Sequence, residues 1–232
     1  MRSPGQRPRK LLLWDIDGTI LHTGKAGETA LGRAMEKIHG FNHGLSGLEI
    51  AGRTDRWIVE QLLAQADRPN GPDEIARFLD VYAELLAEEL PRRNGGLHPG
   101  VMGILEEGHR RSDIVQALLT GNIEKGARLK LTRYGVNHFF EFGAFADDSA
   151  IRNELGPHAQ RRAMERHGEE FPPERIFIIG DTPHDVACAR AIGAKAIAVA
   201  TGSFSEKALR ECGADAVFTD LGHPERFFQL LD

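Results

Sequence analysis

Polar residues able to do chemistry follow three short apolar runs of the sequence. They are Asp15 and Asp17 after residues 11–14, Thr120, Gly121 and Asn122 after residues 114–119, and Asp181 and Asp185 after residues 175–179. Short apolar runs that end in a polar turn are typical of buried strands. If these strands lie side by side, the polar residues meet at one edge of the sheet, where ligands bind in such folds.

Four carboxylates held close together repel one another and raise one another's pKa values. A divalent cation would remove this repulsion. Oxygen ligands suit Mg²⁺, and the sequence has no cluster of Cys and His at zinc spacing. The carboxylates therefore predict a magnesium site.

The same residues supply the parts that phosphoryl transfer needs. A metal-bound carboxylate stays ionised near neutral pH and can attack phosphorus to form an acyl phosphate. A second acid two residues away can protonate the leaving oxygen and later deprotonate water. The Thr120 hydroxyl, with backbone N–H groups at a helix N-terminus, can bind phosphoryl oxygens. Positioning and charge neutralisation are the main requirements of this chemistry.

The elements that position these residues alternate along the chain. Further strands are expected at 196–200, at 216–218 and at 142–145. Helical patterns span 123–134, 157–167 and 184–192, each followed by a glycine that is typical of a helix end. Alternating strands and helices predict an α/β fold with a mostly parallel sheet that is covered on both faces.

Residues 22–96 have a different pattern. Helical apolar spacing occurs at 28–39, 54–65 and 73–90, and no convincing strand is present. A return linker is expected at residues 95–100, which contain three glycines and a proline. The sequence therefore predicts a core made of residues 1–21 and 97–232, with an inserted all-helical domain at 22–96.

Composition narrows the class of protein. The 232 residues carry a formal net charge of −5, which gives no indication of nucleic-acid binding. No apolar run approaches the roughly 20 residues that span a bilayer, and no signal-type apolar segment follows the basic residues 1–10. Two cysteines do not make a disulfide framework. We expect a cytoplasmic protein without nucleic-acid or membrane partners.

Three motifs resemble those of the haloacid dehalogenase-like (HAD) hydrolases. They are Asp-Ile-Asp-Gly-Thr at 15–19, Leu-Thr-Gly-Asn at 119–122 and Gly-Asp-Thr-Pro-His-Asp at 180–185. Their order and spacing are similar to motifs I, II and IV of that family, and the helical residues resemble its C1 cap domain. The resemblance implies a Rossmann-like core with a C1-type cap, and it covers the chain beyond about residue 10.

The resemblance also implies a role for each residue. Asp15 would be the nucleophile and a Mg²⁺ ligand, and Asp17 the general acid and base, with its backbone carbonyl on the metal. Asp181 would hold Mg²⁺, with Asp185 assisting. Thr120, Gly121 and Asn122 would bind the phosphoryl group. The dehalogenase branch lacks an acid at the position of Asp17, so its presence favours phosphoryl chemistry.

One departure from the family concerns a cation. The family usually has a lysine near the start of the helix that precedes the motif IV strand, whereas residues 131–180 contain no lysine. Arg152 lies near the expected place and is the candidate phosphate ligand, although a solvated surface arginine is an equally good interpretation. Lys125 and Lys130 are weaker candidates.

Other residues have two interpretations. The Gly-Arg-Thr-Asp stretch at 52–55 resembles a part of the cap of phosphoglycolate phosphatases and phosphoglucomutases that faces the active site. By this resemblance Arg53 would contact the leaving group. The alternative is that Arg53 is a surface residue. Asp185 is either a metal neighbour or an acid in the first turn of a helix. Asp147 and Asp148 are either loop acids or secondary neighbours of a metal, and loop acids are the favoured interpretation. His184 is either structural or part of the site.

The predicted function is Mg²⁺-dependent hydrolysis of a small phosphomonoester through an aspartyl-phosphate at Asp15, with phosphoglycolate suggested by resemblance. One alternative is a sugar-phosphate phosphomutase on the same scaffold, which would yield an isomer instead of free phosphate. The other is a non-catalytic binding protein that retains the fold, and the missing lysine is its only support.

Overall fold

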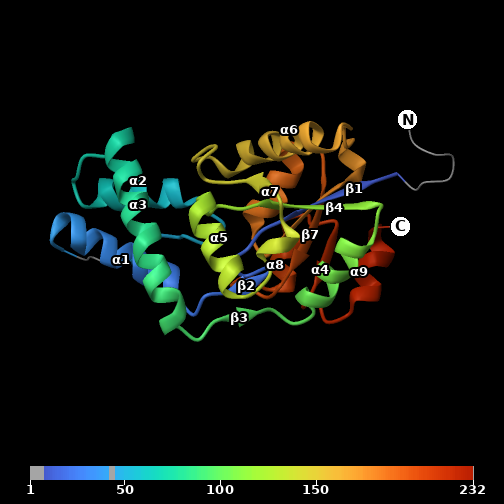
Figure 1. The fold of residues 1–232 in the computed structure, drawn as a ribbon, viewed down its shortest axis with the longest axis horizontal. Coiled ribbons are helices and arrows are strands. Elements are labelled where there is room, and N and C mark those ends of the chain that lie inside the picture. The colour runs from blue at the N-terminus through green and yellow to red at the C-terminus, as the bar shows by residue number, and fades with distance from the viewer. Residues whose placement is uncertain (1–7, 42–44, 232) are drawn as a thin grey trace.

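The computed structural model describes residues 8–41 and 45–231 (Figure 1). Most of the basic N-terminal stretch lies outside the described residues. A six-stranded sheet has the order β5-β4-β1-β6-β7-β8, and every pairing in it is parallel. Its strands are β5 (Gly143–Ala144), β4 (Ile114–Leu119), β1 (Lys10–Trp14), β6 (Ile176–Gly180), β7 (Lys195–Val199) and β8 (Ala216–Phe218). The predicted α/β fold with a parallel sheet is confirmed.

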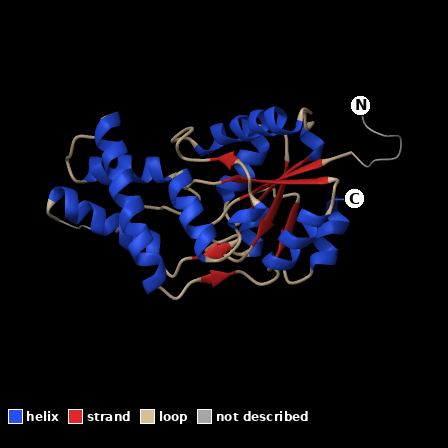
Figure 2. Cartoon of the chain, in the orientation of Figure 1, coloured by secondary structure: helices blue, strands red, loops and turns tan. Residues whose placement is uncertain are grey.

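Helices cover both faces of this sheet (Figure 2). Alternate side chains of β1 point to opposite faces, as the pleat of a strand requires. Leu12 and Trp14 pack with α4 (Val101–Arg110), α5 (Glu124–Arg133) and α9 (Pro224–Leu231). Leu11 and Leu13 pack with α6 (Leu155–His167) and α7 (Pro183–Ala191). Strand β1 is therefore buried on both sides, and this packing fixes the position of the acids that follow it.

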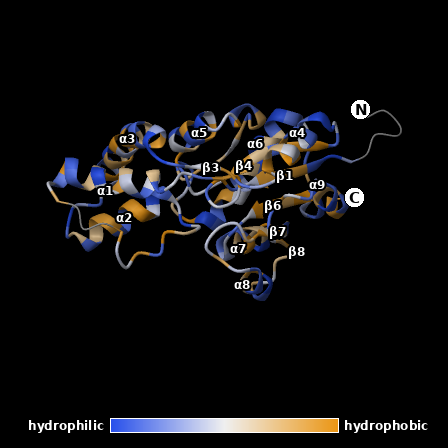
Figure 3. Cartoon of the chain, turned by 90° about the horizontal axis from the view of Figure 1, so that it is seen from below, coloured by the Kyte–Doolittle hydropathy of each residue, from blue (hydrophilic) through white to orange (hydrophobic). Residues whose placement is uncertain are grey.

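A second group of helices lies between β1 and β4 in the chain and beside the sheet in space (Figure 1). It consists of α1 (Ala26–His39), α2 (Asp55–Gln65), α3 (Pro72–Glu89) and the short 3-10 helix η1 (Leu90–Arg92). Apolar residues from all three long helices form a third cluster, which includes Leu31, Leu62 and Phe78. The orange and blue stretches of these helices alternate in Figure 3, as expected of helices with one buried face.

Two short strands connect the helical group to the sheet. β2 (Leu21–His22) and β3 (Gly96–Leu97) pair antiparallel, with Leu21 opposite Leu97. The sequence predicted no strand between residues 22 and 96 and a linker without strands at 95–100, so both strands were missed. Two-residue strands leave no periodic pattern in a sequence, because only their mutual pairing defines them. The domain boundaries at 21/22 and 96/97 stay a prediction, and both coincide with this strand pair.

Other differences concern single elements. The expected strand at 142–145 is reduced to β5. Helices α4, α8 (Glu206–Glu211) and α9 were not predicted. The spacing of Val101, Ile104 and Leu105 is helical, but Gly103 and Gly108 weaken that signal. Gly108 is there for packing, because a Cβ at this position would lie 2.9 Å from the Gln116 side chain on β4.

Helix boundaries shift by small amounts. α6 begins at Leu155, two residues before the expected Pro157. Proline is tolerated there, because N–H groups of the first helical turn have no partner within the helix. Within the described ranges, no helix is long and apolar enough to cross a membrane.

Candidate active site

The three motifs meet at the carboxyl edge of the sheet. Strand β1 lies between β4 and β6, and Trp14 is in register with Leu118 on one side and Ile179 on the other. The residues that follow these strands therefore come together. Asp15, Thr120 and Asp181 are 4%, 0% and 3% exposed, so their polar groups are enclosed by protein.

Three carboxylates form one buried cluster. Asp15, Asp181 and Asp185 each offer an oxygen, and these oxygens lie within 4.8 Å of one another. Glycine makes the close approach possible, because a Cβ at Gly18 or Gly202 would lie 2.4 Å or 1.7 Å from a carboxylate oxygen of Asp181. Gly18 also has a φ of 83°, a backbone conformation that favours glycine.

Arg152 supplies the cation of this cluster. It begins the 3-10 helix η3 (Arg152–Glu154) and is 7% exposed, so its interpretation as a solvated surface side chain is wrong. Its Nη2 lies 3.0 Å from Asp15 Oδ1 and 2.5 Å from Asp185 Oδ1. Its Nη1 donates to the carbonyl of Gly52 at 3.2 Å. Arg152 thus joins the nucleophile candidate, the motif IV loop and the segment before α2.

Asp185 is an acid in the first turn of α7 and also lies in the acidic cluster, and its role as a metal neighbour stays a prediction. Its Oδ2 accepts hydrogen bonds from the backbone N–H and the hydroxyl of Thr182, at 3.0 Å and 2.7 Å, which forms a capping box at the start of α7. Its Oδ1 binds Arg152. Both oxygens therefore have protein partners, whereas Asp181 accepts one hydrogen bond, from the Thr19 hydroxyl at 3.1 Å.

The electrostatics of the cluster favour a bound cation. Burial raises the pKa of Asp15 to about 6 against the opposing effect of Arg152, and burial with the neighbouring acids raises the pKa of Asp181 well above its ordinary value. Three carboxylates beside one guanidinium leave two uncompensated negative charges when all are ionised. One divalent cation would balance them, so the oxygen donors present fit Mg²⁺.

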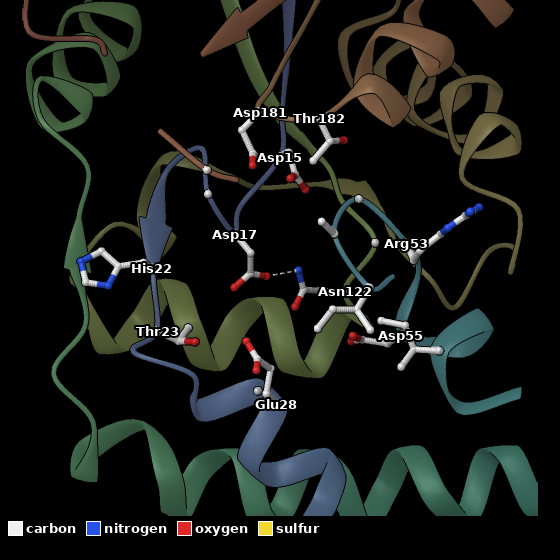
Figure 4. Close-up of a pocket in the computed structure, with 18 of the residues that line it drawn as sticks. Asp15, Asp17, His22, Thr23, Glu28, Arg53, Asp55, Asn122, Asp181 and Thr182 are labelled. Carbon is white, nitrogen blue, oxygen red and sulfur yellow. Dashed lines mark hydrogen bonds between the residues drawn. The ribbon is translucent and has the colours of Figure 1, made fainter. Parts of the chain in front are cut away.

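Asp17 faces away from this cluster. Its carboxylate points toward Asn122, on the opposite side from Asp15 and Asp181 (Figure 4). Asp17 Oδ2 lies 2.8 Å from Asn122 Nδ2 and 2.6 Å from Lys130 Nζ. Lys130, on α5, therefore contacts the candidate general acid and not the candidate nucleophile. The side chain of Asp17 is 42% exposed, whereas that of Lys130 is 5% exposed.

Residues 52–55 pack directly on the motif II loop. The N–H of Asp55 donates to the Gly121 carbonyl at 2.6 Å, and Asp55 Oδ2 accepts from the Ile123 N–H at 2.9 Å. A Cβ at Gly121 would lie 2.1 Å from the Arg53 carbonyl oxygen, so only glycine fits there. Sequence reasoning missed Asp55, because an acid after the helix cap Thr54 has the pattern of an ordinary first-turn residue.

Arg53 lies in the wall of the cavity that Asp15 and Asp17 also line. Its guanidinium packs over the Trp57 ring at 4.4 Å and points away from Asp15 and Asp17 (Figure 4). Its substrate contact stays a prediction. His184 and Arg53 line a smaller cavity next to the main one. Asp148 accepts hydrogen bonds from Arg162 and Asp147 accepts one from the Glu124 N–H, which suits the interpretation of both as loop acids.

A cavity of about 540 Å³ lies in front of the cluster. Asp15, Asp17, Asp181 and Lys130 line it from the sheet side, and helices α1 and α3 contribute Glu28 and Tyr82. The cavity therefore places a ligand between the carboxylates and the helical group, with both contributing walls.

Comparisons with known proteins identify the family of the chain. A family model described as haloacid dehalogenase-like hydrolase matches residues 12–190. The phosphoglycolate phosphatase of Mesorhizobium japonicum is 22% identical over 222 residues, which cover 91% of each protein. The tyrosine-protein kinase PtkA of Mycobacterium tuberculosis is 27% identical over 205 residues, which cover 86% of this chain and 65% of that protein.

A solved structure has the same fold. CbbY from Rhodobacter sphaeroides in complex with phosphate has a TM-score of 0.74 at 18% identity, covering 93% of this chain and 96% of that one. A mutant of that protein is also seen with xylulose-(1,5)bisphosphate. The resemblance drawn from the three motifs is confirmed, and the family and its relatives support a hydrolase of the phosphatase type.

Proposed function

Because the chain belongs to the haloacid dehalogenase-like hydrolase family, we propose that it hydrolyses small phosphomonoesters with Mg²⁺, through an aspartyl-phosphate at Asp15. The buried cluster of Asp15, Asp181 and Asp185 carries this proposal. Clustered carboxylates are unfavourable in a folded protein unless they bind a cation, so their presence points to a metal-dependent task.

Asp15, Asp181 and Asp185 would hold the metal, together with the backbone carbonyl of Asp17. Asp15 and Asp181 have fewer protein hydrogen bonds than Asp185 and are the better direct ligands. Bound Mg²⁺ would neutralise the carboxylates and draw charge from the phosphoryl group.

Asp15 and Asp17 would carry out the two steps of the reaction. A carboxylate oxygen of Asp15 attacks phosphorus, and the bond from phosphorus to the ester oxygen breaks. The leaving oxygen keeps the bonding electrons and takes a proton from Asp17. Asp17 next removes a proton from water, whose oxygen attacks the same phosphorus, and the phosphate leaves with Asp15 restored.

Motif II is suited to holding the phosphoryl oxygens. The Thr120 hydroxyl oxygen accepts hydrogen bonds from the backbone N–H and the side-chain amide of Asn122, at 3.3 Å and 2.9 Å. Since its acceptor capacity is used in this way, its own O–H is directed to a further acceptor such as a phosphoryl oxygen. Arg152 supplies a positive charge beside Asp15, and this supports a catalytic protein over the non-catalytic alternative.

Phosphoglycolate is the first substrate to test, because several relatives are phosphoglycolate phosphatases. A cavity of about 540 Å³ also suits a small ester. The experiment measures phosphate release from phosphoglycolate, p-nitrophenyl phosphate and a panel of sugar phosphates, with Mg²⁺ and with a chelator. We expect turnover that requires Mg²⁺ and falls by at least about 10³-fold in Asp15→Asn.

Asp147→Asn is the matched control, because this acid lies outside the cluster and should leave turnover unchanged. Conversion of a sugar 1-phosphate into its isomer without free phosphate would identify a phosphomutase instead. A folded protein that releases phosphate from none of these esters in the presence of Mg²⁺ would overturn the proposal.

A further inference from the structure

We propose that Lys130 is a positioning residue for the general acid Asp17, which it holds, together with Asn122, on the leaving-group side of the cavity. This inference rests on the proposed phosphatase function. The hydrogen bonds of a buried lysine carry it, and this lysine lies outside the three motifs.

The burial of Lys130 is the first observation. An ammonium group is costly to remove from water unless it is paired, and Lys130 is 4% exposed. It contacts Asp17 Oδ2 at 2.6 Å and Asn122 Oδ1 at 2.5 Å. Both partners belong to the predicted catalytic motifs, so the lysine is built into the site and is not part of the solvated surface of α5.

The hydrogen bonds of Asp17 are the second observation. Both of its side-chain bonds, to Lys130 and Asn122, end on Oδ2. Among the described residues, the other carboxylate oxygen has no hydrogen-bond partner and remains available to a ligand in the cavity. Lys130 and Asn122 therefore set the direction of a side chain that is otherwise half exposed.

Lys130 also fixes the partner that it shares with Asp17. It binds the Asn122 side-chain oxygen, which directs the Asn122 amide nitrogen toward Asp17 and Thr120. The ammonium of Lys130 thus donates to Asp17 and also orients Asn122, the second donor to Asp17. It connects Asp17 to the loop that is proposed to bind phosphate. Loss of Lys130 would release Asp17 and Asn122 together.

The helical group encloses this network. A Cβ at Gly27 on α1 would lie 3.6 Å from the Tyr82 hydroxyl and 3.9 Å from Lys130 Nζ, so α1 passes close to the ammonium. Asp55, on α2, is near enough for the positive charge of Lys130 to oppose the rise of its pKa. The ammonium therefore lies where the helical group meets the sheet edge, beside the expected place of the leaving group.

A general acid matters most when the leaving group is strongly basic. An alkyl phosphate releases an alkoxide that must be protonated, whereas p-nitrophenolate leaves without help. General acid catalysis contributes roughly 10²–10⁴-fold. We expect Lys130→Met to lower kcat/KM by about 10²-fold for glycerol phosphate and by less than about threefold for p-nitrophenyl phosphate. The ratio of the two losses reports on general acid catalysis alone, because kcat/KM covers the steps up to the departure of the leaving group.

Five further variants sharpen the test. Lys125 lies on the exposed side of the same helix, so Lys125→Met should leave kcat/KM unchanged for both esters. Lys130→Arg should recover part of the loss, and Asp17→Asn should reproduce its selectivity. The double variant Lys130→Met with Asp17→Asn should be no worse than Asp17→Asn alone, because both changes disable the same acid. Lys130→Gln keeps an N–H donor, and it replaces the Met variant if that one does not fold.

The outcomes separate this inference from the function itself. If wild type turns over neither ester, the phosphatase proposal fails. If wild type is active and the Lys130 variants lose the same factor on both esters, or lose nothing, Lys130 has only a structural role and the inference is overturned.

Discussion

Among single residues, Arg152 has the contacts that matter most for the charge of the site. Its guanidinium contacts both Asp15 and Asp185, and all three side chains are at most 6% exposed. The planar fork of arginine can bond to two acceptors at once, whereas the ammonium of lysine is a point charge. Arg152 therefore compensates buried charge in the folded protein, and we propose that it also compensates the charge of a bound phosphoryl group.

Replacement of Arg152 should affect stability and activity together. In Arg152→Met, the buried carboxylates of Asp15 and Asp185 lose their cation, and we expect the free energy of unfolding to fall by about 3–5 kcal/mol. Arg152→Lys keeps the charge, so its stability and activity should lie between those of Arg152→Met and wild type. Urea unfolding and phosphate release at saturating Mg²⁺ measure both effects.

Arg161→Met is the control, because the Arg161 side chain is 52% exposed and its contacts with Glu165 and His158 lie at the surface. It should change the unfolding free energy by less than about 0.5 kcal/mol. An Arg152→Met protein as stable and as active as wild type would contradict the role that we assign to the buried pair.

At the scale of elements, the segment before α2 is attached to the core. Asp55 bonds to the loop after β4 through both its N–H and its carboxylate, and the Thr54 hydroxyl donates to the Ala150 carbonyl at 2.7 Å. Arg152 reaches the same segment at Gly52. The helical group thus contacts the loops that hold the phosphate-binding candidates, so its position and the shape of the site are coupled.

Asp55 should make stability depend on pH. Burial raises its pKa from 3.8 to about 6, opposed by Lys130 and by the Ile123 N–H. A raised native pKa means that the protonated form favours folding. This contribution is complete below pH 3.8 and is lost as pH rises through about 6, for a total of about 3 kcal/mol.

Asp55→Asn tests this dependence, since an amide oxygen can still accept from Ile123 and does not titrate. The variant should gain stability relative to wild type as pH rises from about 4 to about 7. Chemical unfolding of both proteins at several pH values in this window gives the difference. A difference that is constant across the window would show that Asp55 titrates as it does in an unfolded chain.

At the level of the whole molecule, residues far apart in the chain support the site. Trp14, the residue before Asp15, stacks on Phe227 of the last helix with ring centroids 5.8 Å apart, and both residues are fully buried. Phe227 also meets Phe228 edge to face at 5.4 Å. Helix α9 therefore closes the core on one face of the sheet, under the strand that presents the nucleophile candidate.

Phe227→Ala should separate stability from chemistry. Removal of a buried ring leaves a cavity, and we expect a loss of about 3–5 kcal/mol in the free energy of unfolding. KM for a hydrolysed ester should stay within about threefold of wild type, because Phe227 lines no part of the main cavity. Leu230→Ala on the same helix is the control, since Leu230 is 39% exposed. An unchanged unfolding midpoint in Phe227→Ala would contradict this account.

Much of the fold follows from local patterns in the sequence. The apolar runs at 11–14 and 114–119 read as buried strands because a strand covered on both faces needs apolar residues at nearly every position. The long helices α1 to α3 have clear apolar spacing and match the expected ranges within two residues. Strands β2 and β3 have no local pattern, because each exists only through its pairing with the other.

Local patterns in the sequence are enough to place acids and a threonine at the ends of three strands, and parallel strands bring such residues to one edge of the sheet. The pairing of each cation with its acid, by contrast, depends on contacts between elements that are distant in the chain. Arg152 reaches Asp15, Lys130 reaches Asp17, and Asp55 bonds to Ile123 across 68 residues of chain. Side-chain direction also required the fold, since Arg53 packs on Trp57 instead of facing the acids. The physical reason is that strand and helix patterns depend on neighbours in sequence, whereas the partners of a buried charge are set by elements that meet only in space.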